Sequence, residues 1–111
     1  MKSEAKIQQE IFVWHWNNRP HERKLLFMVH NEASSRIRGA RLKGQGMVSG
    51  VSDLIYCDPR TNEPVFLEVK NEKGRQSSNQ KDFEQAVTFH GFRYYVVKSV
   101  EDAIKFCGWD E

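Results

Sequence analysis

The sequence predicts an α/β fold in which a mixed β-sheet is flanked by helices, in the order helix, strand, helix, two strands, helix, strand, helix. Two observations predict it. Stretches with apolar residues at helical spacing alternate with short apolar runs of strand length. One segment rich in turn formers, Asp58-Pro-Arg-Thr-Asn-Glu-Pro64, joins two of those runs as a hairpin would. The 111 residues suffice for one domain with its own core, and we expect it to span residues 1–111.

The first half of the chain predicts two helices around one strand. Residues 3–16 form the first helix, since their apolar residues recur every three or four positions. Leu25-Leu-Phe-Met-Val29 is a continuous apolar run, and we expect it in the middle of the sheet, covered on both faces. Ser34 or Ser35 could cap a helix over residues 36–42, which breaks up in a Gly-rich stretch.

The second half, beyond the hairpin, predicts a helix, a strand and a last helix. Ser77 or Ser78 can cap the helix, and Gly91 is well placed to stop it. Residues 93–97 form an apolar and aromatic strand. Ser99 starts the last helix, with an acid three residues later as in a capping box. A connection through the middle helix predicts that two of the strands run parallel.

Three chemically active side chains are expected to converge on the hairpin. Side chains alternate along a strand, so Glu68 and Lys70 share one face while Val69 turns toward the core. If residues 52–57 pair with the strand that ends at Lys70, then Asp53 can lie across from Glu68. Two carboxylates and a lysine would then meet at one point.

This combination suits hydrolysis of a phosphodiester, which needs an activated water, neutralised phosphate charge and help for the leaving oxygen. Mg²⁺ prefers oxygen ligands and keeps several waters, so Asp53, Glu68 and the backbone carbonyl of Val69 are sufficient candidate ligands. Lys70 would lie near the attacking water or near the scissile phosphate, where its charge stabilises the transition state. Both roles stay open.

Four segments in order resemble the VRR-NUC nuclease domain of the PD-(D/E)xK superfamily. The segments are Gly50-Val-Ser-Asp-Leu54, Glu68-Val-Lys70, Gly74-Arg-Gln-Ser-Ser-Asn-Gln80, and Gly91 to Ala103. The resemblance implies a restriction-endonuclease-like core, dependence on Mg²⁺ or Mn²⁺, and cleavage of DNA, often at branched structures such as four-way (Holliday) junctions. It also implies a homodimer, because members consisting of this domain alone, of phage or bacterial type, resemble dimeric junction-cutting enzymes.

The resemblance also implies site residues. Asp53 and Glu68 match the metal-binding acids, Lys70 the catalytic lysine, and Gln80 the glutamine beyond it. Glu10 matches the acid on the first helix near the metal, with Glu4 and Gln9 as competitors. His30-Asn-Glu32 resembles the polar motif after the first strand, so Asn31 and Glu32 are expected to line the cleft. Ser52 stands where the family usually has Pro, which is a departure from its pattern.

Basic residues gather in two stretches although the net charge is only +2. We expect these residues to contact DNA phosphates; the alternative is a solvated surface. They are Arg36, Arg38, Arg41, Lys43, Lys73 and Arg75. Two other functional classes remain: a non-catalytic nucleic-acid-binding module, which would not need the acids and the lysine, and a subunit of a larger DNA-processing assembly.

The remaining features predict reduced cysteines and no membrane-spanning segment. Cys57 and Cys107 have no disulfide-scaffold spacing, and the four histidines lack zinc spacing with them. The amino end opens an amphipathic helix, and no run approaches the length needed to span a membrane. We therefore expect a cytoplasmic protein, in a bacterium or in the bacterial host of a phage.

Overall fold

The structure, a computed structural model, describes residues 1–30 and 36–111. Its helices are α1 (Glu4–Asn18), the 3-10 turn η1 (Pro20–Glu22), α2 (Arg36–Gly44), α3 (Ser78–Phe89) and α4 (Val100–Cys107). Its strands are β1 (Leu26–Met28), β2 (Leu54–Asp58), β3 (Glu63–Val69) and β4 (Arg93–Val97). The predicted order of helices and strands is confirmed, and η1 is an addition that the sequence did not reveal.

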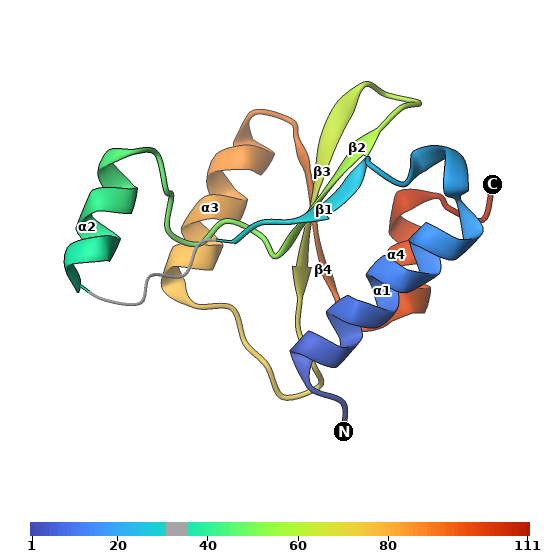
Figure 1. The fold of residues 1–111 in the computed structure, drawn as a ribbon, viewed down its shortest axis with the longest axis horizontal. Coiled ribbons are helices and arrows are strands. Elements are labelled where there is room, and N and C mark those ends of the chain that lie inside the picture. The colour runs from blue at the N-terminus through green and yellow to red at the C-terminus, as the bar shows by residue number, and fades with distance from the viewer. Residues whose placement is uncertain (31–35) are drawn as a thin grey trace.

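The strands form one mixed sheet in the order β1-β2-β3-β4 (Figure 1). β1 and β2 pair antiparallel, as do β2 and β3, whereas β3 and β4 run parallel. The chain reaches β4 from β3 through α3, since a parallel neighbour needs a crossover and cannot follow a tight turn. The predicted hairpin and the predicted parallel pair are both confirmed.

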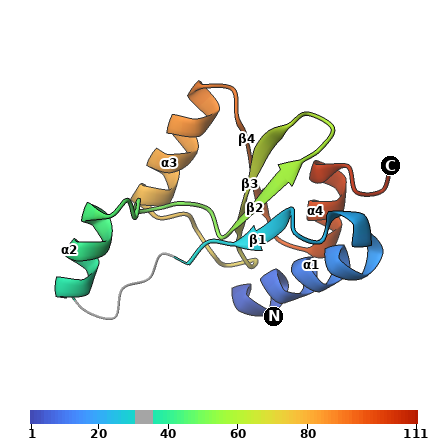
Figure 2. The same cartoon turned by 45° about the horizontal axis from the view of Figure 1, so that its top comes forward.

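Helices cover the two faces of the sheet unequally. α1 and α4 lie together on one face and α3 lies on the other, with α2 at the far end of the molecule (Figures 1 and 2). The α1/α4 face holds the main core, where Ile7 and Ile11 of α1 meet fully buried Leu54, Leu67 and Val97 of the sheet. α3 buries none of its residues and contacts the sheet through aromatic pairs such as Phe66 with Phe83.

The expectation that residues 25–29 lie in the middle of the sheet is wrong. β1 pairs only with β2 at one end of the strand order, and Phe27 and Met28 are 43% and 59% exposed. Only Leu26 is buried there. A run of apolar residues predicts a strand, but not how many neighbours the strand has.

Polar caps fix the helix starts that flank the sheet. Ser77 caps α3 in a capping box with Gln80, and Ser99 caps α4 by accepting from the N–H of Asp102 at 3.1 Å. Gly108, in the left-handed conformation, ends α4. The predicted caps of α2, Ser34 and Ser35, lie outside the described residues.

A buried ion-pair network ties the end of α1 to the sheet. Glu22 is 3% exposed and receives hydrogen bonds from Arg19, at 2.8 and 2.9 Å, and from the hydroxyl of Tyr56 at 2.7 Å. His15 lies 3.2 Å from the same carboxylate. These partners of suitable charge and polarity offset the cost of removing Glu22 from water. Across residues 1–30 and 36–111, no helix combines the length and apolarity needed to cross a membrane.

Candidate active site

Asp53 lies directly before β2, and its side chain reaches across to β3. The register pairs Leu54 with Leu67, which brings Asp53 beside Glu68 one step further along. The carbonyl of Asp53 accepts from the N–H of Val29 at 2.9 Å, so β1 fixes its backbone. Its carboxylate Oδ2 accepts from the N–H of Val69 at 2.7 Å. The side chain of Asp53 is therefore held over the end of β3.

Glu68 is the centre of the cluster and is 1% exposed. Its Oε2 accepts from Nε2 of Gln80 at 2.8 Å and lies 3.4 Å from Nζ of Lys70. Its Oε1 is buried and has no hydrogen-bond partner within the described part of the chain. One carboxylate oxygen is thus held by donors while the other is open to a further cation or donor.

Burial disfavours the ionised form of both carboxylates. Burial raises the pKa of Asp53 above its ordinary value, although the N–H of Val69 and the charge of Lys70 oppose this. Burial also raises the pKa of Glu68, and the charge on Asp53 raises it further. Two adjacent acids with raised pKa values can be stabilised by sharing a proton or by binding a divalent cation.

Gln80 is fixed to the cluster by the start of α3. Its Oε1 accepts from the backbone N–H of Ser77 at 2.8 Å, and its own N–H donates to Oγ of Ser77 at 3.2 Å. The backbone of Gly50 packs against this turn, since a Cβ on Gly50 would collide with the carbonyl group of Asn79. Gly50 also has a φ of +85°, so glycine is required for both reasons.

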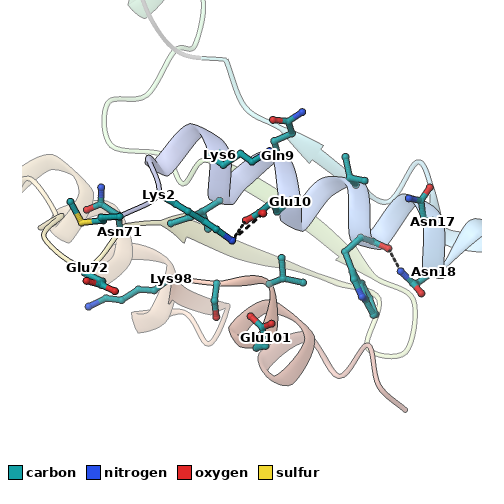
Figure 3. Close-up of a pocket in the computed structure, with 16 residues that line it drawn as sticks. Lys2, Lys6, Gln9, Glu10, Asn17, Asn18, Asn71, Glu72, Lys98 and Glu101 are labelled. Atoms are coloured by element: carbon teal, nitrogen blue, oxygen red, sulfur yellow. Dashed lines mark hydrogen bonds and ion pairs between the residues drawn. The ribbon is translucent and has the colours of Figure 1, made fainter.

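The acid that α1 brings to the cluster is Glu4, and the expectation for Glu10 is corrected. Oε1 of Glu4 lies 4.0 Å from Nζ of Lys70, and its Oε2 accepts from the N–H of Asn71 at 3.3 Å. Glu10 instead pairs with Lys2 at 2.9 Å in a groove of about 1010 Å³ between α1 and α4 (Figure 3). The two acids are six positions apart on the helix, which is a net rotation of about 240° about its axis, so one helix cannot present both to the same point.

The loop between Lys70 and α3 adds contacts that were not predicted. Gly74 packs directly on the Glu4 carboxylate and the Lys70 side chain, so a Cβ there would require the Glu4 side chain to shift. At its other end, Nε2 of Gln76 donates to Glu84 at 3.0 Å and to the hydroxyl of Tyr94 at 3.2 Å. These contacts depend on tertiary packing, and no local sequence pattern could have identified them.

The cluster fits a divalent metal ion by the chemistry of its donors. Asp53 and Glu68 supply carboxylate oxygens, Oε1 of Glu68 is buried without a partner among the described residues, and the backbone carbonyl of Val69 remains a candidate ligand. No three His, Cys, Asp or Glu side chains among residues 1–30 and 36–111 converge as a metal site. Water would have to complete the coordination, as Mg²⁺ permits.

The residues expected to contact DNA lie on the surface, apart from the cluster or at its border. Arg36, Arg38, Arg41 and Lys43 are exposed on α2, which buries none of its residues. Lys73 and Arg75 are exposed in the loop that follows Lys70. Asn31 and Glu32, expected to line the cleft, lie outside the described residues.

Ser52, at the position where the resemblance led us to expect Pro, is buried and forms a hydrogen bond within its own turn. It is 1% exposed, and its Oγ donates to the carbonyl of Leu54 at 3.1 Å. This hydrogen bond spans Asp53 and limits the freedom of the turn that carries it. The hydroxyl thus supplies part of the rigidity that a proline ring would provide.

A mixed sheet with two adjacent carboxylates and a lysine at the end of its hairpin, and a glutamine that reaches them from the following helix, is typical of restriction-endonuclease-like α/β domains. The family model described as the VRR-NUC domain matches residues 2–101. The chain belongs to the VRR-NUC family, a family of nuclease domains. A solved structure described as a VRR_NUC domain protein has the same fold, with a TM-score of 0.78 and 16% identity over 98% of this chain and 89% of that one. No curated protein sequence is significantly similar.

Proposed function

We propose that the protein is a Mg²⁺- or Mn²⁺-dependent endonuclease that cleaves branched DNA, such as four-way junctions, as a homodimer. The observation that carries the proposal is the pair of half-buried Asp53 and buried Glu68, with Lys70 and Gln80 on one oxygen of Glu68 and no partner for the other oxygen among the described residues. A buried carboxylate oxygen without a donor is unusual, and a divalent cation bound beside Asp53 would satisfy it, as a proton shared with Asp53 would in the metal-free protein. Membership of a nuclease-domain family supports the same conclusion.

Each residue has a part in the proposed reaction. Asp53, Glu68 and the Val69 carbonyl would hold the metal ion, which when bound neutralises phosphate charge and lowers the pKa of water. Lys70 is 8% exposed and is held between two carboxylates, so its ammonium is restrained at the edge of the site. From there it can stabilise charge on the phosphate or orient the attacking water. Gln80 holds Glu68 in place.

The experiment uses labelled four-way junction, flap, single-stranded and linear duplex DNA, each with Mg²⁺, Mn²⁺ or EDTA. We expect metal-dependent cleavage that is fastest on branched DNA and is lost in Lys70→Ala. Lys105→Ala, an exposed lysine of α4, is the matched control and should cut like the parent. If no substrate is cut with either metal, or if Lys70→Ala cuts as well as the parent, the nuclease proposal fails. Binding without cutting would favour the non-catalytic module.

Basic residues on α2 are proposed to bind DNA phosphates. Replacing Arg36, Arg41 and Lys43 together by Ala should weaken binding of all DNA shapes alike. The slope of log K against log salt should fall by ~0.9 for each phosphate that the variant no longer neutralises. Fluorescence anisotropy over a salt series measures both effects. Because these residues are exposed, the triple variant should retain its thermal stability. An unchanged salt slope would exclude α2 from the DNA interface.

A further inference from the structure

The carboxamide of Gln80 is held in one orientation by two different partners. Its Oε1 accepts from the main-chain N–H of Ser77, and its Nε2 donates to Oε2 of Glu68, both at 2.8 Å. If the amide were turned over, its NH₂ would face an N–H donor and its oxygen would face a carboxylate. Both contacts would be repulsive, since neither pair would include a donor and an acceptor. The carboxylate of Glu68 and the N–H of Ser77 therefore require the same orientation of the amide, and the N–H of Ser77 holds the amide from the end opposite Glu68.

This orientation determines how the two oxygens of Glu68 are used. Oε2 is held by Gln80 and by the Lys70 ammonium at 3.4 Å. Oε1 is buried and has no partner within the described residues. With its NH₂ toward Glu68, Gln80 fixes the carboxylate by one oxygen and leaves the second oxygen available. A reversed amide would instead repel the carboxylate and displace it.

We propose that Ser77 is a positioning residue of the active site, whose main-chain N–H orients the Gln80 amide so that Oε1 of Glu68 stays free as a metal ligand. The proposal rests on the proposed function, because a free Oε1 matters only if a cation binds there. It differs from simple helix capping, which needs only the Oγ of Ser77 to accept from the N–H of Gln80. The hydrogen bond from the N–H of Ser77 to Oε1 of Gln80, which completes the capping box, thus also positions a residue of the active site.

The orientation can be tested in the metal-free protein by NMR, independently of activity. The Gln80 side-chain NH₂ should show nuclear Overhauser contacts to Lys70 and to the Glu68 methylenes. These contacts should persist in Ser77→Ala, which keeps the N–H, and disappear in Ser77→Pro, which removes it. The φ of −72° at Ser77 suits proline. Overhauser contacts that are absent in the parent, or unchanged in Ser77→Pro, overturn the proposal.

The consequence for the site is measured by calorimetric titration with Mn²⁺ in the absence of DNA. Ser77→Pro should weaken Mn²⁺ binding at least about fivefold relative to Ser77→Ala, as expected for a group that orients a metal ligand. Gln80→Ala should weaken it to the same extent, and the double variant should be no weaker, because the two residues act in series. Equal affinity in Ser77→Pro and Ser77→Ala would overturn the proposal.

Two further comparisons keep the result interpretable. Ser99→Ala removes the equivalent cap of α4 and should lower the melting temperature without changing Mn²⁺ affinity. If Ser77→Pro does not fold, a variant with an ester in place of the peptide bond before Ser77 is used instead. This variant lacks only that N–H and is compared with Ser77→Ala in the same way. If the parent binds no Mn²⁺ but shows the predicted NMR contacts, the proposal of a metal-dependent nuclease is refuted. If the parent binds Mn²⁺ but lacks those contacts, the proposed role of Ser77 is refuted.

Discussion

At the scale of single residues, the choice of acid on α1 is the sharpest difference between the expected site and the observed one. Glu4 approaches Lys70 and Asn71, whereas Glu10 pairs with Lys2 in the groove beside α4. We expect Glu4→Gln to lower the metal-dependent cleavage rate by at least about tenfold, because the charge that holds Lys70 from α1 is removed. Rates at saturating DNA, measured over a range of Mg²⁺ concentrations, give this effect.

Glu10→Gln is the matched control for this prediction. It makes the same chemical change on the same helix but breaks only an exposed ion pair, whose contribution to stability is small. It should cut DNA at the parent rate. If Glu10→Gln loses cleavage while Glu4→Gln remains active, the acid of α1 that serves the site is Glu10 and not Glu4.

The sequence predicted the positions of side chains that depend on local backbone geometry, but not of those that depend on packing between distant segments. The shared face of Glu68 and Lys70, and the opposite face of Val69, were predicted correctly because side chains alternate along any strand. Choosing between Glu4 and Glu10 required the rotation of α1 against the sheet, which depends on packing among distant residues. The Gln76 contacts with Glu84 and Tyr94 join three separate segments, so they were out of reach for the same reason.

Glu22 is predicted to make the free energy of unfolding depend on pH. Hydrogen bonds from Arg19, and then from Tyr56 and His15, lower its pKa from 4.5 to about 2. Because the carboxylate is favoured in the folded state, its stabilisation is complete above about pH 4.5 and is lost as the pH falls toward 2. Compared with the parent, Glu22→Gln should be less stable by about 3 kcal/mol at pH 7, and this difference should shrink below pH 4.5.

Urea unfolding at several pH values between about 7 and 2.5 measures this difference. Glu63→Gln, which changes an exposed acid at the start of β3, is the control and should leave the stability profile unchanged. A constant difference between the parent and Glu22→Gln over this range would mean that the native ion-pair network does not stabilise the ionised form. The measurement is independent of nuclease activity.

At the scale of elements, the contact between Gly50 and α3 sets where Gln80 lies. A Cβ at Gly50 would meet the backbone of Asn79, whereas Gly46, also at positive φ, has open space around it. Gly46→Ala should therefore cost only the conformational strain of about 1–2 kcal/mol. Gly50→Ala should cost a further amount of about 1–3 kcal/mol, because a backbone collision must also be relieved.

The two glycine variants should also differ in activity. Relief of the collision in Gly50→Ala moves the start of α3, so Gln80 should lose its hydrogen bond to Glu68 and cleavage should fall. Gly46→Ala should cleave like the parent when both are assayed well below their melting temperatures. Equal stability loss in the two variants would show that the approach of Gly50 to α3 is not tight in solution.

Elements were predicted well where their signals were local, and less well where they depended on neighbours. The caps at Ser77 and Ser99 and the hairpin turn each fix a local backbone geometry, so the order of elements followed from the sequence. The position of β1 did not, since an apolar strand looks alike in the middle of a sheet and at its edge. Exposure of Phe27 and Met28 distinguishes the two only once the fold is known.

At the scale of the whole molecule, exposed apolar side chains gather along β1 and the neighbouring side of α1. Phe27 and Met28 line a hollow of about 400 Å³ together with Phe12 of α1, and Trp16, paired with Phe12, is 41% exposed. Adjoining exposed apolar groups of this kind mark interaction surfaces in soluble proteins. We expect a second copy of the chain to cover this surface in the proposed homodimer, since isologous contact places two sites in a fixed relation.

Light scattering at the assay concentration tests this expectation and should give about twice the chain mass of 13.0 kDa. Phe27→Asp should give the monomer mass and lose paired incisions on four-way junctions, because a charge would be buried at the interface. Phe89→Asp, which alters an 84% exposed residue of α3, should remain a dimer and cut normally. A monomeric parent that cleaves junctions would refute the dimer, and a dimeric Phe27→Asp would place the interface elsewhere. The spacing of two Asp53–Glu68 sites across that interface would then determine which branched DNA fits.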